Sequence, residues 1–548
     1  MTEADVVDIA RRIHTRDVSL WAAAPEAQSI VGKRLGWLDA PDWLSVNREE
    51  LTTWARDIRG QGFARVVVLG MGGSSLAAQA LAGVFGKTEQ GLPLVVLDTT
   101  HPAAVTAAAA CLPETLFVSA SKSGTTAEVT ALTAYFYQQV KAERGRAAGE
   151  NFVAITDAGS ALQRYAEAHD FRRCFLNPTD VGGRFSVLTA FGMVPAALLG
   201  LDLDRMFNSA RTARAASGAD TPDADPSALR LGQAMARSAL AGRNKLTLLL
   251  SPQLGAFSGW VEQLVAESIG KSGIGIIPVI DESLPIGAYG MDRFFVAVTL
   301  TGDHTLDKTL QALEAAGHEI DHHQLDDRYG LAGEFFRWEF AVAVTGALLA
   351  VNPFDEPDVV SSKQTTRRLL EGKKEEQANS IGEIRDDAGL TLRMPISLVD
   401  EDAGLSGQLL RFFQNAGPTN YLTLMPFLYM TDDVQNALSE LITALRAVLP
   451  LPVILNPGPR YLHSTGQLHK GGPNTGLYLI ITASTDTMLA IPGEPYSFSD
   501  LNNAQASGDF LSLAALDRQV AHLDLGSSPQ QALAAVTAEV QLRWTESA

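Results

Sequence analysis

The chain has 548 residues and a net charge of −19 at pH 7, with 46% hydrophobic residues. A chain of this length is expected to fold as several domains of roughly 100–200 residues each. The negative charge argues against a surface for nucleic acid or for an anionic membrane, because both would repel it. A phosphate-bearing ligand would need local positive charge at its site, so the few basic residues in polar loops matter.

Cysteine content and hydropathy further restrict the possible class of protein and its cellular location. Cys111 and Cys174 are too few for a disulfide framework or a cysteine-rich metal site. The N-terminal stretch MTEADVVDIARRIHTRD is charged and has no apolar core like that of a signal peptide. No uninterrupted apolar run reaches the ~18 residues of a membrane span. We therefore expect a cytosolic protein with neither a membrane nor a nucleic acid as partner.

Apolar strands alternate with helices along the chain, which is typical of parallel sheets covered on both faces. We predict a helical extension over 1–60 and a first α/β domain over 61–215. We predict a second α/β domain over 216–370, a polar linker over 371–405 and a third, smaller α/β domain over 406–548. The predicted strands of the first two domains are 66–70, 94–98, 116–121, 152–157 and 174–177, then 246–251, 275–280 and 294–300.

A glycine-rich turn follows the first predicted strand. Residues 66–76 read VVVLGMGGSSL, so that Gly73 and Ser74 lie just before a helix. Glycine lets the backbone approach a ligand closely, and a helix N-terminus favours an anion. The turn has neither the spacing of a dinucleotide-binding loop nor a Walker lysine. It indicates a phosphate group more than a dinucleotide, with a purely structural turn as the alternative.

A second loop of this kind ends the third predicted strand. Residues 119–129 read SASKSGTTAEV and carry four candidate phosphate ligands: Ser121, Lys122, Ser123 and Thr126. Loops rich in serine and threonine are usually solvated turns. Two of them at the carboxyl ends of strands in one sheet, each opening a helix, favour a phosphorylated small molecule.

Two further segments carry candidate catalytic groups. Arg184 follows a double glycine in VGGRFS at 181–186, where a surface ion pair is the alternative. In the helix after the strand 246–251, Gln263 and Glu267 are four residues apart and share one face. Apolar neighbours would desolvate Glu267 and raise its pKa toward that of a general base. An ordinary exposed helix glutamate is the alternative.

Residues 318–327, HEIDHHQLDD, raise the question of a metal site. The histidines and aspartates there have no standard ligand spacing. We therefore interpret the segment as a charged surface strand and loop, and we expect no metal.

Taken together, the segments LGMGGSSL, SASKSGTT, VGGRFS, AESIGK and NPFDEPDVVSSK, in this order from 69 to 363, resemble the phosphoglucose isomerase family. This resemblance implies two sugar-isomerase (SIS) domains, each a doubly wound parallel sheet between helices, at the first two predicted domains. The third domain, with YLHSTGQLHKGGPNTG at 461–476, resembles the branch known from transaldolase–isomerase fusion proteins, here without the transaldolase.

The resemblance also implies a reaction and roles. The reaction is the reversible isomerisation of glucose 6-phosphate and fructose 6-phosphate through a cis-enediol, without a cofactor and commonly in a homodimer. Glu267 matches the base, Arg184 the arginine that stabilises the enediolate, and Lys363 the lysine of ring opening. Gln263 matches a substrate-contacting glutamine, and the two polar loops match the phosphate site.

The chain departs from the family at two positions. Asp292, in GAYGMD, stands where the family usually has a histidine, so ring opening would use Lys363 with Asp292, or His463 or His469; a loop-stabilising role is the alternative for both histidines. Glu356 stands at the position of a usual substrate-binding glutamine. Another sugar-phosphate isomerase, for mannose or amino-sugar phosphates, and a non-catalytic sugar-phosphate sensor are the competing interpretations.

Overall fold

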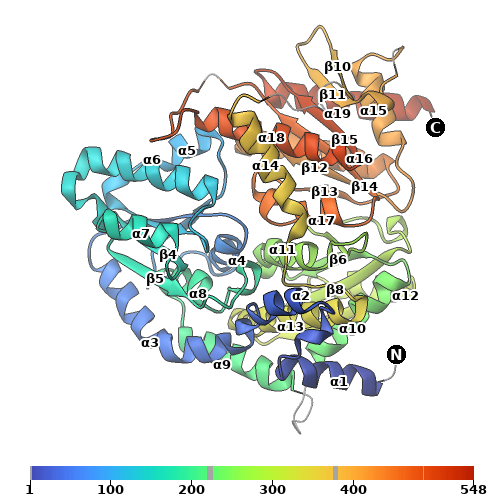
Figure 1. Cartoon of the computed structure of the whole chain (residues 1–548). Coiled ribbons are helices and arrows are strands. Elements are labelled where there is room, and N and C mark those ends of the chain that lie inside the picture. Colours follow the sequence, from blue (N-terminus) through green and yellow to red (C-terminus); the bar gives the residue numbers. More distant parts are fainter. Residues whose placement is uncertain (1–2, 219–225, 374–379, 401, 486, 548) are drawn as a thin grey trace. The chain divides into compact units, whose positions relative to one another are not determined.

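The computed structural model describes residues 3–218, 226–373, 380–400, 402–485 and 487–547. They form two compact units: Met1–Asp98 with Ala108–Glu356, and Thr99–Ala107 with Pro357–Ala548. Three sheets with flanking helices make up these units (Figure 1). This arrangement confirms the predicted α/β fold class, in which two parallel-sheet domains precede a third α/β domain.

The first sheet has five parallel strands in the order β2-β1-β3-β4-β5. Residues 66–69 are buried because helices cover both faces. Helices α1, α2 and α3 precede the sheet, and α3 packs on α8. The elements are α1 (Glu3–His14), α2 (Pro25–Gly32), α3 (Ala40–Arg59), β1 (Arg65–Gly70), α4 (Leu76–Phe85), β2 (Leu94–Leu97), β3 (Thr115–Ala120), α6 (Ala127–Arg144), β4 (Phe152–Asp157), α7 (Ala161–Ala168), β5 (Arg173–Asn177) and α8 (Ala190–Leu198).

The second sheet belongs to the same unit and has four parallel strands in the order β7-β6-β8-β9. Residues 219–225, close to the predicted start of this domain at 216, lie outside the described residues. The elements are α9 (Leu203–Ala216), α10 (Ser227–Leu240), β6 (Lys245–Leu250), α11 (Ser258–Ile269), β7 (Ile277–Val279), β8 (Arg293–Leu300), α12 (Asp307–Ala315), β9 (Ile320–Leu325) and α13 (Leu331–Leu349).

The third sheet has six strands in the order β10-β11-β15-β14-β12-β13, in which β11 runs antiparallel to its neighbours β10 and β15 and the other pairs are parallel. The elements are α14 (Val360–Leu370), β10 (Ile381–Arg385), β11 (Thr391–Pro395), α15 (Leu405–Gln414), β12 (Tyr421–Pro426), α16 (Asp432–Val448), β13 (Val453–Leu455), α17 (Gly466–Gly471), β14 (Gly476–Thr482), α18 (Phe498–Ala515), β15 (Gln519–Asp524) and α19 (Pro529–Ser547).

The polar segment 371–405, predicted as a linker, contains β10 and β11 in its described part. In β11 only alternate residues are buried, namely Leu392 and Met394. An antiparallel edge hairpin that buries one face alternates apolar and polar residues, so its composition looks like that of a loop. The prediction allowed for one strand in this linker, and its described part contains two.

A short segment between β2 and β3 belongs to the second unit. It contains most of α5 (Pro102–Ala108), and just before that helix the Thr100 hydroxyl donates to Gln505 Oε1 of α18 at 2.7 Å. Burial also lowers the pKa of His101 to about 4. No pattern in the sequence indicated that residues 99–107 contact α18, a helix about 400 residues later.

No described helix is both long and apolar enough to cross a membrane.

Helix α13 runs through the core of the first unit and carries buried charges. Glu334 is bonded to Arg337 at 2.8 Å and to the Trp338 indole at 3.2 Å, and it also pairs with His323. Burial would raise the pKa of Glu334, but Arg337 and His323 outweigh it and hold the pKa at about 2. Glu339 differs, since neither of its carboxylate oxygens has a hydrogen-bond partner among the described residues. Burial raises the pKa of Glu339 well above 4.5.

We expect Glu339→Gln to stabilise the protein at pH 8. A carboxyl whose pKa is raised by folding contributes stability that is fully present below pH 4.5 and is lost as the pH rises. That loss amounts to about 1.4 kcal/mol per pH unit until the folded pKa is reached, and glutamine does not undergo it. Urea midpoints at pH 5.5 and 8.0 measure the effect. Tryptophan fluorescence reports on this unit, because it holds the tryptophans at 21, 37, 43, 54, 260 and 338.

The matched control for this change is Glu314→Gln on α12, where the carboxylate is exposed. We expect the control to leave both midpoints unchanged. Equal midpoint differences between pH 5.5 and 8.0 in the wild type and Glu339→Gln would show that Glu339 is not held protonated.

Candidate active site

The predicted base lies where the two parallel sheets of the first unit meet. Glu267 is in α11, which follows β6 through a short 3-10 turn, as the strand–loop–helix pattern predicted. Most of α11 is buried, because it packs between the second sheet's helices and the first sheet's loops. It contacts the 3-10 turns Gly72–Ser74 and Gly183–Phe185. Glu267 therefore shares one region with both of these loops.

Arg184 is held in one orientation by neutral acceptors. Its Nε donates to Ser268 Oγ at 2.8 Å, and its Nη2 donates to the carbonyl oxygens of Pro353 at 2.7 Å and Asp355 at 2.8 Å. The side chain is only 4% exposed. Because the guanidinium is planar, these three bonds also fix the direction of its remaining nitrogen, Nη1.

Nη1 of Arg184 faces two carboxylates. It lies 3.3 Å from Glu267 Oε1 and 3.1 Å from Glu356 Oε2. On the other side, Gln263 donates from Nε2 to Glu267 Oε2 at 3.1 Å. The structure thus brings Gln263, Glu267 and Arg184 together, and it adds Glu356, the residue that departs from the family pattern.

The two carboxyl groups have different proton affinities. Burial is the main influence on Glu267 and raises its pKa; Arg184 opposes this effect, while the charge of Glu356 adds to it. Burial would also raise the pKa of Glu356, but the charge and hydrogen bond of Arg184 outweigh it, so the pKa falls. Glu267 is therefore the stronger base of the pair.

Lys271 was not among the predicted site residues. Its Nζ donates to the carbonyl oxygens of Asn352 at 2.6 Å and Asp355 at 2.5 Å, and it pairs with Asp355 Oδ1 at 2.8 Å. Burial, with the charge of Arg184, lowers the pKa of Lys271 to about 8. The lysine fixes the turn that carries Glu356 and the two carbonyls that orient Arg184. Its only signal in the sequence was its place at the end of AESIGK.

The loop predicted to bind phosphate is a compact turn between β3 and α6. Ser121 Oγ lies 3.0 Å from Thr126 Oγ1 and accepts the Gly124 N–H at 3.1 Å. Gly124 has φ +70°, and a Cβ there would lie 2.2 Å from the backbone nitrogen of Leu162. The position thus requires glycine, and α6 begins at residue 127 with its first N–H groups unpaired within the helix.

The other two predicted residues of this loop have partners of their own. Lys122 Nζ pairs with Asp157 and donates to the carbonyl oxygen of Thr179 at 3.1 Å. Burial raises the pKa of Asp157, with Lys122 and then Arg34 acting against the rise. Ser123 is exposed, and its hydroxyl bonds with that of Thr125.

The first glycine turn is pressed against the loop of Arg184. A Cβ on Gly73 would lie 2.3 Å from the carbonyl group of Gly183 and 2.8 Å from the Arg184 nitrogen. Only glycine allows this approach, so Gly73 and Ser74 are placed beside the Arg184 loop. A small cavity of about 60 Å³ nearby is lined by Arg34, Lys122, Arg184, Phe354 and Glu356, among others.

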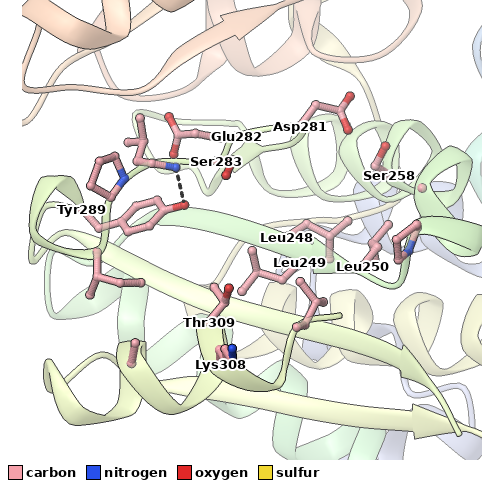
Figure 2. Close-up of a pocket in the computed structure, with 17 residues that line it drawn as sticks. Leu248, Leu249, Leu250, Ser258, Asp281, Glu282, Ser283, Tyr289, Lys308 and Thr309 are labelled. Atoms are coloured by element: carbon pink, nitrogen blue, oxygen red, sulfur yellow. Dashed lines mark hydrogen bonds between the residues drawn. The ribbon is translucent and has the colours of Figure 1, made fainter. Parts of the chain in front are cut away.

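A larger cavity of about 580 Å³ lies in the second parallel-sheet domain (Figure 2). Residues 248–250, at the carboxyl end of β6, form part of its wall, and the loop 281–289 forms another. The Tyr289 hydroxyl accepts the Leu284 N–H at 3.1 Å and steadies that loop. The lining includes neither Glu267 nor Arg184, so this cavity is distinct from the predicted site.

Two predicted catalytic residues lie in the second unit. Lys363 is exposed on α14. His469 is buried on α17 between the rings of Tyr461 and Tyr478, and burial lowers its pKa to about 3. An enclosed neutral histidine suits the alternative of loop support better than proton transfer near neutral pH.

Asp292 and the histidine-rich segment also have structural partners. Asp292 pairs at 2.7 Å with buried Lys245, at the amino ends of β8 and β6. In β9, His322 bonds with Thr299, while His323 pairs with Glu334. No cluster of three metal-ligating side chains occurs in the described parts of the chain.

Known proteins are similar in sequence to a large part of this chain. The chain is 32% identical over 395 residues to the glucose-6-phosphate isomerase of Symbiobacterium thermophilum, a match that covers 61% of this chain and 86% of that protein. The chain belongs to the phosphoglucose isomerase family. The family model for phosphoglucose isomerase matches residues 49–276, which include Glu267, Arg184 and both phosphate-loop candidates.

Two solved structures are similar in fold to this chain. A hypothetical protein from Thermus thermophilus aligns with a TM-score of 0.57 and 25% identity, over 67% of this chain and 94% of that one. A glucose-6-phosphate isomerase from Chlamydia trachomatis aligns with a TM-score of 0.51 and 19% identity, over 68% of this chain and 79% of that one. The second likeness supports the fold.

Proposed function

We propose that this phosphoglucose isomerase family member interconverts glucose 6-phosphate and fructose 6-phosphate, with Glu267 as the base. The observation that carries the proposal is a buried carboxylate of raised pKa beside a fixed arginine. In the direction from fructose 6-phosphate, Glu267 takes the proton from C1 and returns it to C2, with a cis-enediol between the two steps. A carboxylate of raised pKa suits both steps, because it is a stronger base than an ordinary glutamate and can return the proton that it has accepted.

Arg184 is proposed to stabilise the negative charge that develops on the substrate oxygen. Its three neutral hydrogen bonds orient the guanidinium before substrate arrives, so that little reorganisation is needed during the reaction. Gln263 is proposed to orient the Glu267 carboxylate and to contact the sugar. Glu356 contacts the same nitrogen of Arg184. The substrate oxygen would therefore either replace Glu356 at this nitrogen or bind beside it.

The phosphate is proposed to bind at the two glycine- and hydroxyl-containing loops, through Gly73, Ser74, Ser121, Lys122, Ser123 and Thr126. Hydroxyl donors and the N-terminus of α6 provide hydrogen bonds for phosphate oxygens.

Ring opening is assigned to Lys363 by family resemblance. The placement of His469 supports a structural role for that residue, and its catalytic role stays a prediction.

The test is a coupled assay on purified protein with fructose 6-phosphate in the presence of a chelator. Glucose 6-phosphate formation is followed through glucose-6-phosphate dehydrogenase, and the Glu267→Gln protein, purified in parallel, controls for contaminating host isomerase. We expect chelator-insensitive turnover from the wild type alone. Turnover only with mannose or amino-sugar phosphates would favour the related isomerase, and sugar-phosphate binding without turnover would favour the sensor.

We further propose that the protein is cytosolic, as cysteine content and hydropathy indicated, and that it is a homodimer, as the family resemblance implies. Light scattering coupled to size-exclusion chromatography measures the oligomeric state, and cell fractionation measures the location. A monomer in solution that retains full turnover would rule out a site completed by a second copy.

A further inference from the structure

Arg34, in the N-terminal extension, is an additional cation at the small cavity of the site. It comes just after α2, in a region for which the sequence predicted only packing helices. It lines the cavity together with Lys122 of the phosphate loop and with Arg184 and Glu356. An ideal Cβ at Gly182 would lie 4.0 Å from Arg34 Cδ, so the arginine stem runs along the loop that presents Arg184.

The backbone around Arg34 is fixed to that same loop. Leu35 forms an antiparallel bridge with Val181, and the Gly36 N–H donates to the carbonyl oxygen of Asp180 at 2.9 Å. Leu35 itself is 1% exposed. The position of Arg34 is therefore set by the packed core, although its side chain is only half-buried.

The other cations of the site already have carboxylate partners. Arg184 faces Glu267 and Glu356, Lys122 pairs with Asp157, and Lys271 pairs with Asp355. These three cations are thus paired with four carboxylates, which leaves a net charge of −1 when all of them are ionised.

The guanidinium of Arg34, in contrast, has no hydrogen bond or ion pair with any residue in the described ranges of the chain. Its charge is near enough to Asp157 and Glu356 to oppose the effect of burial on both carboxyl groups. Arg34 therefore lies near both the Lys122 pair and the Arg184 pair, and its guanidinium donors have no acceptor among the described residues.

We propose that Arg34 binds the phosphate group of the sugar phosphate, an inference that rests on the proposed function. A dianionic phosphate enters a chain of net charge −19, at a site whose other cations are already matched by carboxylates. An uncommitted guanidinium provides the missing positive charge and can donate two parallel hydrogen bonds to phosphate oxygens. The N-terminal extension thus supplies a ligand to the site as well as covering the first sheet.

The test compares three variants with the wild type. Arg34→Gln removes the charge and keeps a shorter polar side chain, Arg34→Lys keeps the charge without the planar fork, and Lys33→Gln removes the neighbouring exposed charge as a matched control. The readouts are kcat and KM for fructose 6-phosphate, and the inhibition constant of inorganic phosphate. Because the Arg34 guanidinium has no hydrogen bond or ion pair with a described residue and acts on Asp157 and Glu356 only through its charge, we expect the thermal midpoints to change little.

We expect Arg34→Gln to raise KM and the phosphate inhibition constant about tenfold or more, as for the loss of a hydrogen bond between charged groups. We expect kcat to stay within about threefold, Arg34→Lys to be intermediate and Lys33→Gln to stay within about twofold. An unchanged phosphate constant in Arg34→Gln, an equal effect of Lys33→Gln, or a fall in kcat at constant KM would each overturn the proposal.

Calorimetry separates this inference from the proposed function. Binding of inorganic phosphate is measured on the Glu267→Gln protein with and without Arg34→Gln, so that no turnover is needed. Tenfold weaker binding with the second change supports the role of Arg34 even for a protein that does not isomerise fructose 6-phosphate. Equal binding by the two proteins overturns that role even if the isomerase activity is established.

Discussion

Replacing Glu267 by glutamine is expected to lower kcat about 1000-fold, the middle of the range for a positioned general base. The amide has nearly the same shape but cannot accept and return the substrate proton. Binding should persist, because the phosphate loops are unchanged and Arg184 keeps its hydrogen bonds to Ser268, Pro353 and Asp355. The coupled assay gives kcat, and calorimetry with fructose 6-phosphate gives the dissociation constant, expected within about threefold of the wild type.

The same helix provides a matched control. Glu262 is also buried in α11, five residues earlier, and Glu262→Gln removes the same charge without touching the Arg184 pair. We expect its kcat to stay within about threefold. If Glu267→Gln stays within about tenfold of the wild type, or ~1.4 kcal/mol of barrier, while Glu262→Gln is inactive, the base has been assigned to the wrong carboxylate.

The parts of the site that lie just after strands could be predicted from the sequence. A run of apolar residues followed by glycine, serine or threonine and then by a helical pattern locates the carboxyl end of a parallel strand. Ser121 and Gly73 were proposed as phosphate ligands in this way, and the helix after β6 supplied Glu267 as the candidate base. Local patterning was sufficient here because the sheet brings consecutive strand ends to the same edge.

Contacts between distant segments could not be predicted in the same way. Lys271 meets the turn at Asn352 and Asp355, 81 and 84 residues later, and nothing in either segment indicates the other. Arg34 reaches the site because Leu35 pairs with Val181, a single bridge without strand periodicity. The family resemblance implied the roles proposed for Arg184 and Lys363, whereas composition and spacing alone left a surface ion pair as the alternative for Arg184.

We expect Lys470→Met to reduce the free energy of unfolding of the second unit by about 3–5 kcal/mol. Lys470 Nζ lies 2.6 Å from Asp509 Oδ1, and the two side chains are 1% and 0% exposed. Asp509 also accepts hydrogen bonds from Ser362 at 2.9 Å and Tyr461 at 2.8 Å. Burial would raise the pKa of Asp509, but Lys470 and these hydroxyls outweigh it and lower the pKa. Methionine keeps the volume of the side chain but leaves a buried carboxylate without its cation.

Lys373→Met is the matched control, because it removes the same charge from an exposed pair. Lys373 Nζ lies 2.6 Å from Glu371, but the two side chains are 65% and 40% exposed. A pair in water contributes about 0–1 kcal/mol, so the control should change stability little. Urea unfolding followed by near-ultraviolet circular dichroism measures both variants, since Tyr421, Tyr461 and Tyr478 are buried in this unit.

The double variant Lys470→Met with Asp509→Asn separates the attraction within the pair from the cost of an isolated charge. If most of the loss comes from leaving Asp509 charged and unpaired, neutralising Asp509 should recover part of the stability. A loss of stability from Lys470→Met as small as that from Lys373→Met would mean that water reaches Asp509.

Asp509 also accepts a hydrogen bond from Ser362, the residue before Lys363. If the Lys470→Met protein folds but converts fructose 6-phosphate more slowly, this buried pair affects the proposed ring-opening residue.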